Sequence, residues 1–214
     1  MKIVILCEGQ SEEQVLKPLI KPFMDKVASQ GQKVGLKPHR IPAGNFFKQT
    51  EKHVYDSLTK YDNVLAVFSI YDLYNFPCAD SMEKMGYRER VISLKNYLKN
   101  KVNENYREKF FPHFAVHETE AWLYAYPECT KGMLGKTLPS DTPPEQINFG
   151  ENTHPSKRLE EFFRTNNPTK KRYLKTTHGP KLFEKIIKDE KVDQIRKECE
   201  HFNQLVQDLL RLCR

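Results

Sequence analysis

The chain has 214 residues, of which 38% are hydrophobic, 29% are charged and 11% are aromatic. A chain of this composition buries a core and exposes a charged surface, which excludes a disordered tail or a fibrous protein. The longest apolar runs, residues 3–7 and 64–71, fall far short of the roughly 20 residues that a membrane helix needs. We therefore expect neither a signal peptide nor a membrane anchor.

The cysteine content bears on the cellular compartment of the protein, and the charge distribution bears on its binding partner. The five cysteines are scattered and form no CxxC pair, which argues against a disulfide framework or a zinc site and favours a cytoplasmic protein. The formal net charge is +7, and residues 154–214 carry 15 basic against 9 acidic side chains. This region is the expected surface for a polyanion, although solvated lysines on ordinary helices would give the same signature.

The first elements of the chain read as strand, turn and helix. Residues 2–7 form a β-branched run typical of a strand buried on both faces. A turn follows, and Ser11 is the expected N-cap of a helix that Pro18 and Pro22 should kink. The next elements are predicted in this order: a strand at 34–41, a helix at 45–60, a strand at 63–71, a helix at 81–102, a strand at 110–116 and a helix at 118–126.

Alternating strands and helices predict an α/β domain with a mostly parallel central sheet flanked by helices, over residues 1–126. Residues 127–155 are rich in Pro, Gly, Thr and Asn and predict a connection with little structure of its own. Residues 156–214 are expected to form a basic helical extension packed on the same domain, with helices at 156–164, 180–188 and 192–212.

Acidic residues follow three of the predicted strands. Glu8 follows the first strand, Asp72 follows the strand at 63–71, and Glu118 and Glu120 follow the strand at 110–116. The carboxyl ends of parallel strands share one edge of the sheet, where ligands bind. Carboxylates converging there from separate elements suit Mg²⁺ or Mn²⁺, and Glu12, in the first helical turn, is close enough to join them.

His117 precedes this last acidic pair. As a neutral imidazole it could ligate a softer metal such as Mn²⁺ or donate a proton, but a histidine opening a helix equally often makes a structural hydrogen bond. We therefore rank His117 below the carboxylates as a candidate catalytic residue.

Several motifs resemble known proteins. Residues 7–13, Cys-Glu-Gly-Gln-Ser-Glu-Glu, look like the EGxTE signature of Toprim-like proteins, and residues 71–77 stand where that fold carries its aspartate motif. Together with these two, the motifs at 117–123, 155–158, 178–180 and 195–203 follow the order of one bacterial family designated only as a domain of unknown function. The chain is identified as a member over essentially its whole length. Members of that family resemble Toprim-related proteins, often encoded beside an ABC-type or OLD-type ATPase in phage-defence islands.

The resemblance implies a Toprim-like Rossmannoid fold and a Mg²⁺ or Mn²⁺ site. By position, Glu8 matches the glutamate used for metal binding or acid–base chemistry, and Asp72 matches the first of two aspartates. Tyr74 occupies the place of the second, so a further carboxylate would have to come from Glu118 or Glu120, as in OLD-type nucleases. The predicted catalytic residues are Glu8, Asp72, His117, Glu118 and Glu120, and the predicted metal ligands are Glu8, Glu12, Asp72 and Glu120.

Basic residues form a second group. Lys157 and Arg158 begin a predicted helix, and the other cations predicted to hold a nucleic-acid backbone are Lys170, Lys171, Arg172, Lys175, His178 and Lys181. A charged connection between helices, or contact with an acidic surface of an ATPase partner, would explain the same residues.

The leading hypothesis is a divalent-metal-dependent phosphodiesterase, a nuclease effector that cleaves DNA or RNA, with tRNA among the candidates, in antiphage defence with a partner ATPase. The chain has no Walker motif of its own. One alternative is a non-catalytic Toprim-like adaptor that binds nucleic acid or the ATPase, and another is a small-nucleotide hydrolase or sensor. The sequence is also compatible with a homo-oligomer.

Overall fold

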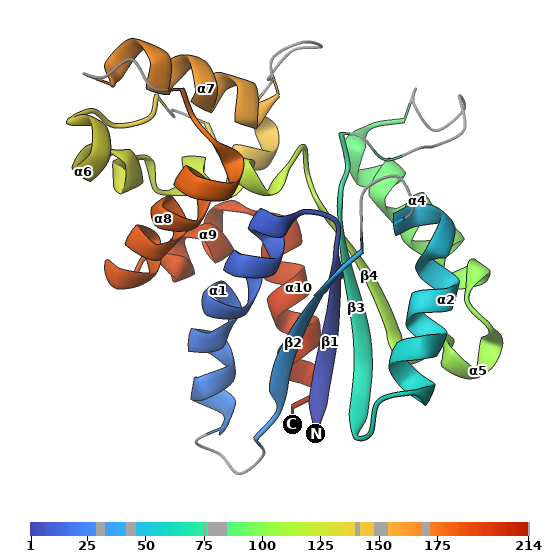
Figure 1. The fold of residues 1–214 in the computed structure, drawn as a ribbon. Helices are drawn as coiled ribbons and strands as arrows, with labels where there is room; N and C mark the ends of the chain where they lie inside the picture. The colour runs from blue at the N-terminus through green and yellow to red at the C-terminus, as the bar shows by residue number, and fades with distance from the viewer. Residues whose placement is uncertain are drawn as a thin grey trace.

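The computed structural model describes residues 1–28, 33–41, 46–74, 76, 85–139, 142–147, 154–167 and 172–213. Within them lies a sheet of four strands: β1 (Lys2–Cys7), β2 (Gly35–Arg40), β3 (Val64–Asp72) and β4 (Phe110–Ala115). The strand order is β2-β1-β3-β4 and every pair is parallel, so all carboxyl ends lie at one edge, at the top of the sheet in Figure 1. The predicted α/β fold class is confirmed.

Helices cover both faces of the sheet (Figure 1). On one face lie α1 (Gln10–Ala28) and α10 (Glu200–Arg211), with α8 (Lys175–Lys188) packed against α1, and on the other lie α2 (Phe46–Thr59) and α4 (Tyr87–Lys101). Side chains alternate between the faces with a period of two. Ile3, Ile5 and Cys7 of β1 therefore join the α1 side, whereas Val4 and Leu6 join the α2 side. The continuous apolar run of β1 is the consequence of covering both faces.

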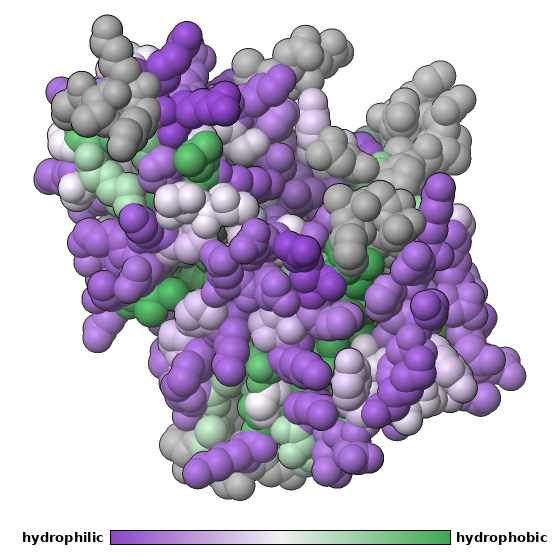
Figure 2. Space-filling view, in the orientation of Figure 1, coloured by the Kyte–Doolittle hydropathy of each residue, from purple (hydrophilic) through white to green (hydrophobic). Residues whose placement is uncertain are grey.

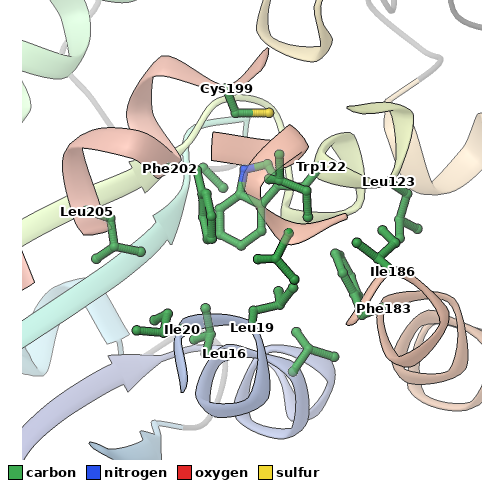
Figure 3. Close-up of a cluster of buried hydrophobic side chains, with 14 of the residues drawn as sticks. Leu16, Leu19, Ile20, Trp122, Leu123, Phe183, Ile186, Cys199, Phe202 and Leu205 are labelled. Atoms are coloured by element: carbon green, nitrogen blue, oxygen red, sulfur yellow. The ribbon is translucent and has the colours of Figure 1, made fainter. Parts of the chain in front are cut away.

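The larger core lies between the sheet and the α1 side. Trp122 packs against Phe202 of α10, with ring centroids 4.9 Å apart. Leu16 and Leu19 of α1 approach the same cluster, and α8 contributes Phe183 and Ile186 (Figure 3). The C-terminal helices thus share one core with the sheet. The face shown in Figure 2 is mostly hydrophilic, with apolar side chains visible only in small separate areas.

Seven shorter or peripheral elements complete the described chain: α5 (Glu104–Arg107), η1 (Thr119–Ala125), η2 (Pro127–Thr130), α6 (Lys131–Leu134), η3 (Pro144–Gln146), α7 (Pro155–Asn166) and α9 (Val192–Glu198). Three of them, η2, α6 and η3, lie in the segment predicted as a connection. None of the helices in the described ranges is both long enough and apolar enough to cross a bilayer.

Several predicted boundaries shift. The helix expected at 118–126 is the 3₁₀ helix η1, all of whose residues are buried, so it has no solvent face of the kind an amphipathic α-helix presents. Ser11 lies inside α1, which begins at Gln10, and its hydroxyl donates to the Glu12 carboxylate instead of capping the helix. Pro18 and Pro22 both lie within α1. The starts of the helices predicted at 45 and 81 lie outside the described residues.

The helix predicted at 192–212 is two helices, α9 and α10, separated at the buried Cys199. Glu145 of η3 caps the N-terminus of α10. Its carboxylate accepts a hydrogen bond from the backbone N–H of His201 and lies 2.9 Å from His201 Nδ1. Because these bonds use a free N–H of the first helical turn, the segment before α7 holds the start of α10.

We predict that Glu145→Ala lowers the free energy of unfolding by about 2 kcal/mol, because it leaves a buried N–H and a buried imidazole without their acceptor. Urea unfolding measures this. The matched control is Glu161→Ala, which removes an exposed carboxylate from α7 and should change stability by less than about 0.5 kcal/mol. Equal stabilities of the two variants would contradict the capping role of Glu145.

Candidate functional site

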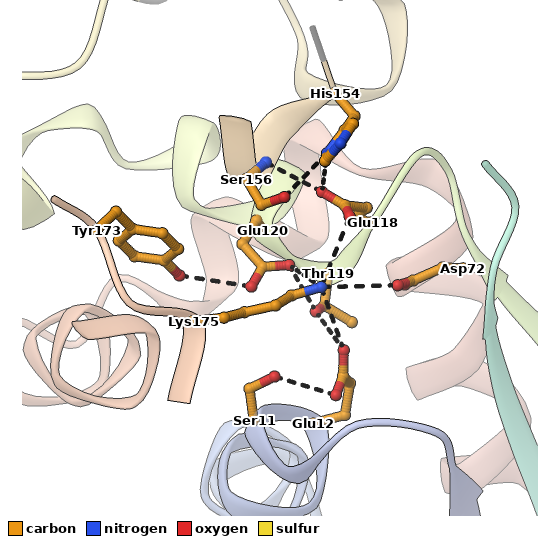
Figure 4. Close-up of polar contacts among 10 residues, drawn as sticks. All are labelled: Ser11, Glu12, Asp72, Glu118, Thr119, Glu120, His154, Ser156, Tyr173 and Lys175. Carbon is orange, nitrogen blue, oxygen red and sulfur yellow. Dashed lines mark hydrogen bonds and ion pairs between the residues drawn. The ribbon is translucent and has the colours of Figure 1, made fainter. Parts of the chain in front are cut away.

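Four carboxylates surround the ammonium of Lys175, the first residue of α8 (Figure 4). The Nζ atom lies 3.0 Å from Glu120 Oε2 and 3.6 Å from Glu118 Oε1. It lies 3.8 Å from Asp72 Oδ2 and 3.9 Å from Glu12 Oε1. We call these four residues and Lys175 the carboxylate cluster. An ammonium has only three N–H groups, so it cannot donate to all four carboxylates at once.

The four carboxylates come from separate parts of the fold. Glu12 is in the first turn of α1, Asp72 ends β3, and Glu118 and Glu120 lie at the start of η1, just after β4. Asp72 follows Ile70 with the strand period of two and so lies on the α1 side of the sheet. The parallel sheet therefore collects these groups at its carboxyl edge, where the sequence predicted a site.

Hydroxyl groups hold two of the carboxylates in place. Ser11 Oγ donates to Glu12 Oε2 at 3.1 Å. Thr119 Oγ1 lies 3.2 Å from Glu12 Oε1 and 3.3 Å from Glu120 Oε2, and its single proton can serve only one of them at a time. The buried Tyr173 donates to Glu120 Oε1 at 3.4 Å. Glu12 and Glu120 are thus linked through one shared hydroxyl.

Glu118 is held by the start of α7. Its Oε2 accepts from the backbone N–H of Ser156 at 3.0 Å and lies 3.2 Å from His154 Nδ1. Ser156 Oγ lies 2.9 Å from the same Nδ1. A serine–histidine–carboxylate relay needs both ring nitrogens, one for each partner, so this trio is not a nucleophile with its base. It orients Glu118 with Oε1 towards Lys175.

The pKa values follow from burial and crowding. Burial raises the pKa of Glu120 to about 7; the nearby carboxylates add to this and Lys175 opposes it. Burial likewise raises the pKa of Asp72. Burial also acts to raise the pKa of Glu118, but Lys175, Ser156 and His154 outweigh it and lower that pKa. Burial acts to lower the pKa of Lys175, and the four carboxylates raise it well above its usual range.

Gly9 allows Glu12 to reach this position. A Cβ atom at residue 9 would stand 1.8 Å from Glu12 Oε2, a distance at which the carboxylate would have to move. Gly179 of α8 likewise leaves room for the Tyr173 ring, since a Cβ at residue 179 would stand 2.8 Å from the phenolic oxygen. Two glycines are therefore needed for the close packing around the cluster.

The donor set suits a hard cation, because carboxylate oxygens are the ligands that Mg²⁺ and Mn²⁺ prefer. Its centre is filled by the Lys175 ammonium, and the oxygens stand wider than the roughly 2.1 Å of a Mg²⁺ shell. No three His, Cys, Asp or Glu residues among those the structure describes are arranged as metal ligands. The donor atoms are thus of the kind that a divalent cation takes, whereas their present spacing accommodates an ammonium.

Glu8 does not join the cluster. It lies one residue beyond the end of β1, whose Val4 and Leu6 join the core on the α2 side. Its charge acts on Tyr71 of that core, whose pKa is raised mainly by burial. Among the described residues, Glu8 makes no ion pair with Lys175. Its catalytic role stays a prediction.

His117 adopts a left-handed backbone with φ of 68°, and its carbonyl accepts from the Tyr74 N–H. Burial lowers the pKa of His117, opposed by Glu145 and Glu118. The imidazole is thus favoured in its neutral form. Whether it takes part in catalysis stays a prediction.

The predicted nucleic-acid contacts divide into several groups. Lys157 and Lys181 are exposed, Arg158 is half-buried, and Arg172 is exposed with Glu160 at 3.7 Å. His178 Nδ1 accepts from the Leu174 N–H and so caps α8. Lys175 faces the carboxylates instead of open solvent. Lys170 and Lys171 lie outside the described residues, and nucleic-acid binding by the whole group stays a prediction.

The sequence reasoning missed six contributors to the site: Lys175 as the central cation, and Ser11, Thr119, Tyr173, His154 and Ser156 as orienting groups. Two signals were present in the motifs. Thr119 lies between Glu118 and Glu120, and Ser156 is the second residue of the 155–158 motif.

Comparison with known proteins places the chain in a family. A family described as Domain of unknown function (DUF4276) matches residues 7–210. The chain belongs to this family. Membership of a family designated only in that way was predicted from the ordered motifs, and the DUF4276 match confirms it.

Two solved structures show weak likeness to this DUF4276 chain. One is the C-terminal region of the Xanthomonas campestris pv. campestris OLD protein, at 15% identity and a TM-score of 0.43, covering 98% of this chain and 96% of that one. The other is the C-terminal region of the Burkholderia pseudomallei OLD protein, at 13% identity and a TM-score of 0.38, covering 97% and 98%. No curated protein matches the chain. With TM-scores below 0.5, we draw nothing about activity from these likenesses.

We predict that Glu120→Gln stabilises this DUF4276 chain above neutral pH. Because the folded-state pKa of Glu120 is raised from 4.5 to about 7, its contribution to stability is present below pH 4.5 and is lost as the pH rises through 7. Glutamine mimics the protonated form, so the variant should be about 2–3 kcal/mol more stable than wild type at pH 8, with no gap near pH 4.5.

Urea unfolding in EDTA at four values between pH 4.5 and 8 measures this gap. The exposed control Glu161→Gln should run parallel to wild type. A Glu120→Gln variant less stable than wild type at pH 8 would mean that the ion pair with Lys175 outweighs the crowding of the carboxylates.

Proposed function

We propose that the chain is a divalent-metal-dependent phosphodiesterase and acts as a nuclease on DNA or RNA. The observation that supports this most directly is the convergence of Glu12, Asp72, Glu118 and Glu120 on one cation at the carboxyl edge of a parallel sheet. Four carboxylates around one ammonium exceed what charge compensation needs, because one carboxylate neutralises one ammonium and each further buried carboxylate adds a desolvation cost. A site for a more highly charged cation accounts for the excess.

In this proposal the four carboxylates hold Mg²⁺ or Mn²⁺. The bound metal would polarise the phosphodiester and lower the pKa of a water. The chain's own groups orient the site: Ser11 and Thr119 hold Glu12, Tyr173 holds Glu120, and the start of α7 holds Glu118. Lys175 is 33% exposed and sits on a flexible stem, so its ammonium can turn from the carboxylates to a phosphate oxygen.

The biological setting of the proposal rests on the motif resemblance. Toprim-like proteins of this kind are expected beside an ATPase in phage-defence islands, with tRNA or DNA as the substrate. The exposed cations Lys157, Arg172 and Lys181 would hold the nucleic-acid backbone.

We predict that the wild-type chain binds Mn²⁺ in titration calorimetry and that Asp72→Asn lowers the affinity at least tenfold, since it removes one charged ligand. Glu161→Gln, which removes a distant exposed carboxylate, should leave binding unchanged. No binding by wild type at millimolar Mn²⁺ would contradict the metal site. Cleavage of labelled tRNA and single-stranded DNA in Mn²⁺, lost in Asp72→Asn, would then identify the substrate.

A second variant in the same titration tests the site without changing a charge. Gly9→Ala should weaken Mn²⁺ binding, because its Cβ would displace the Glu12 carboxylate. Gly132→Ala is the matched control, since a Cβ there would meet no atom within 4 Å. Equal Mn²⁺ affinity of the two variants would remove Glu12 from the ligand set.

The second candidate function is the non-catalytic adaptor. The position of Lys175 favours it, because an ammonium already at the centre makes the cluster a structural ion-pair network that needs no metal. The absence of a carboxylate at Tyr74 points the same way.

Lys175→Met discriminates between the two functions. Without metal we predict a loss of about 2–3 kcal/mol in both cases, because the variant leaves buried carboxylates without a partner. A metal site predicts that Mn²⁺ restores the thermal midpoint of the variant. An adaptor predicts that the midpoint stays low in Mn²⁺. Lys188→Met, which breaks the exposed pair with Glu184, is the control for losing a lysine.

A further inference from the structure

An exposed aromatic ring lies at the rim of the carboxylate cluster. Tyr74 is 40% exposed. It follows Asp72 by two residues, and its backbone N–H donates to the carbonyl of His117, next to Glu118. The backbone of Tyr74 is therefore attached to the loop that carries Glu118.

The ring of Tyr74 contacts the site through one intervening side chain. Its centroid lies 5.1 Å from that of His154, with the planes inclined by 41°. His154 Nδ1 in turn lies 3.2 Å from Glu118 Oε2. The order from the surface inward is thus Tyr74, His154 and Glu118. Lys157, in the first turn of α7, is an exposed positive charge next in the chain to Ser156.

We propose that Tyr74 stacks on an unpaired nucleobase next to the phosphate that lies over the carboxylate cluster. The inference deepens the proposed function and rests on it. Every base has a π-face, so an exposed tyrosine binds a single strand with little sequence preference. In a duplex the base faces are already stacked on their neighbours, so Tyr74 selects single-stranded regions or loops. Lys157 binds the backbone beside that base.

The contacts of the Tyr74 side chain favour its role in base stacking. The backbone N–H of Tyr74 is hydrogen-bonded and its ring lies beside that of His154, so these contacts limit the orientations open to the ring. A pre-positioned ring loses little conformational entropy when a base stacks on it. The side chain therefore suits a binding surface better than a flexible surface residue would.

The test is the binding of labelled 12-mer oligothymidylate and oligouridylate to the full chain, with Ca²⁺ in place of Mn²⁺, followed by fluorescence anisotropy. We expect Tyr74→Ala to weaken single-strand binding about tenfold and Tyr74→Phe to retain it, since the ring supplies the contact. The slope of affinity against salt should not change, because no phosphate contact is lost. The matched control is Tyr97→Ala, which removes a ring of equal exposure, 41%, from α4 on the other face of the sheet.

Three outcomes would overturn the stacking role. One is wild-type affinity in Tyr74→Ala, the second is equal weakening in Tyr74→Ala and Tyr97→Ala, and the third is no binding of either oligonucleotide by wild type. Competition by thymidine monophosphate as strong as that by the 12-mer would support base stacking but would assign it to a small nucleotide.

Mn²⁺ calorimetry on the same preparations separates this inference from the proposed function. Intact Mn²⁺ binding with no effect of Tyr74→Ala on oligonucleotides removes the stacking role alone. Absent Mn²⁺ binding in wild type removes the metal-dependent activity, whatever the oligonucleotides do.

Discussion

Crowding of like charge is the constraint on which this structure depends. Four carboxylates lie within 4 Å of one ammonium at the edge of the sheet, and most of them are out of contact with water. Burying a carboxylate is unfavourable unless charge and hydrogen bonds compensate it. The pKa values of Asp72 and Glu120 are raised because Lys175 only partly compensates the burial of their carboxylates. A fold selected for stability alone would not assemble such a group.

The sheet and the helices bring the four carboxylates together and supply the groups that stabilise them. The parallel sheet delivers Asp72 and the start of η1 to one edge, and α1 brings Glu12 to the same place. Helices α7 and α8 then close over the group, the first with a backbone N–H for Glu118 and the second with Lys175. The C-terminal helices are therefore part of the site as well as part of the core.

The sequence predicts those features that follow from local patterns. Hydrophobic runs locate β1, β3 and β4, whereas β2 has Leu36 as its only large aliphatic residue. The rule that parallel strands end at one edge identifies Asp72, Glu118 and Glu120. The same rule does not distinguish Glu8, which makes no ion pair with Lys175 among the described residues, because an acidic residue just beyond a strand can turn to either face. Lys175 resembled any other lysine of a basic run, since its neighbours in space come from residues far away in the chain. The break before α10 depends on Glu145, a contact that no local pattern encodes.

The spread of the site along the chain also bears on synthesis at the ribosome. Glu12, Asp72, Glu118 and Glu120 are all made before Lys175, and the core that holds α1 also needs Phe202 of α10. A nascent chain that has formed its strands thus carries mutually repelling acids with no counter-charge and an apolar surface with no cover. The first is resolved when α8 emerges with Lys175, and the second when α10 emerges with Phe202. Termination between these two helices therefore leaves a chain with its neutralising lysine but without its complete core, a natural substrate for chaperones and proteases.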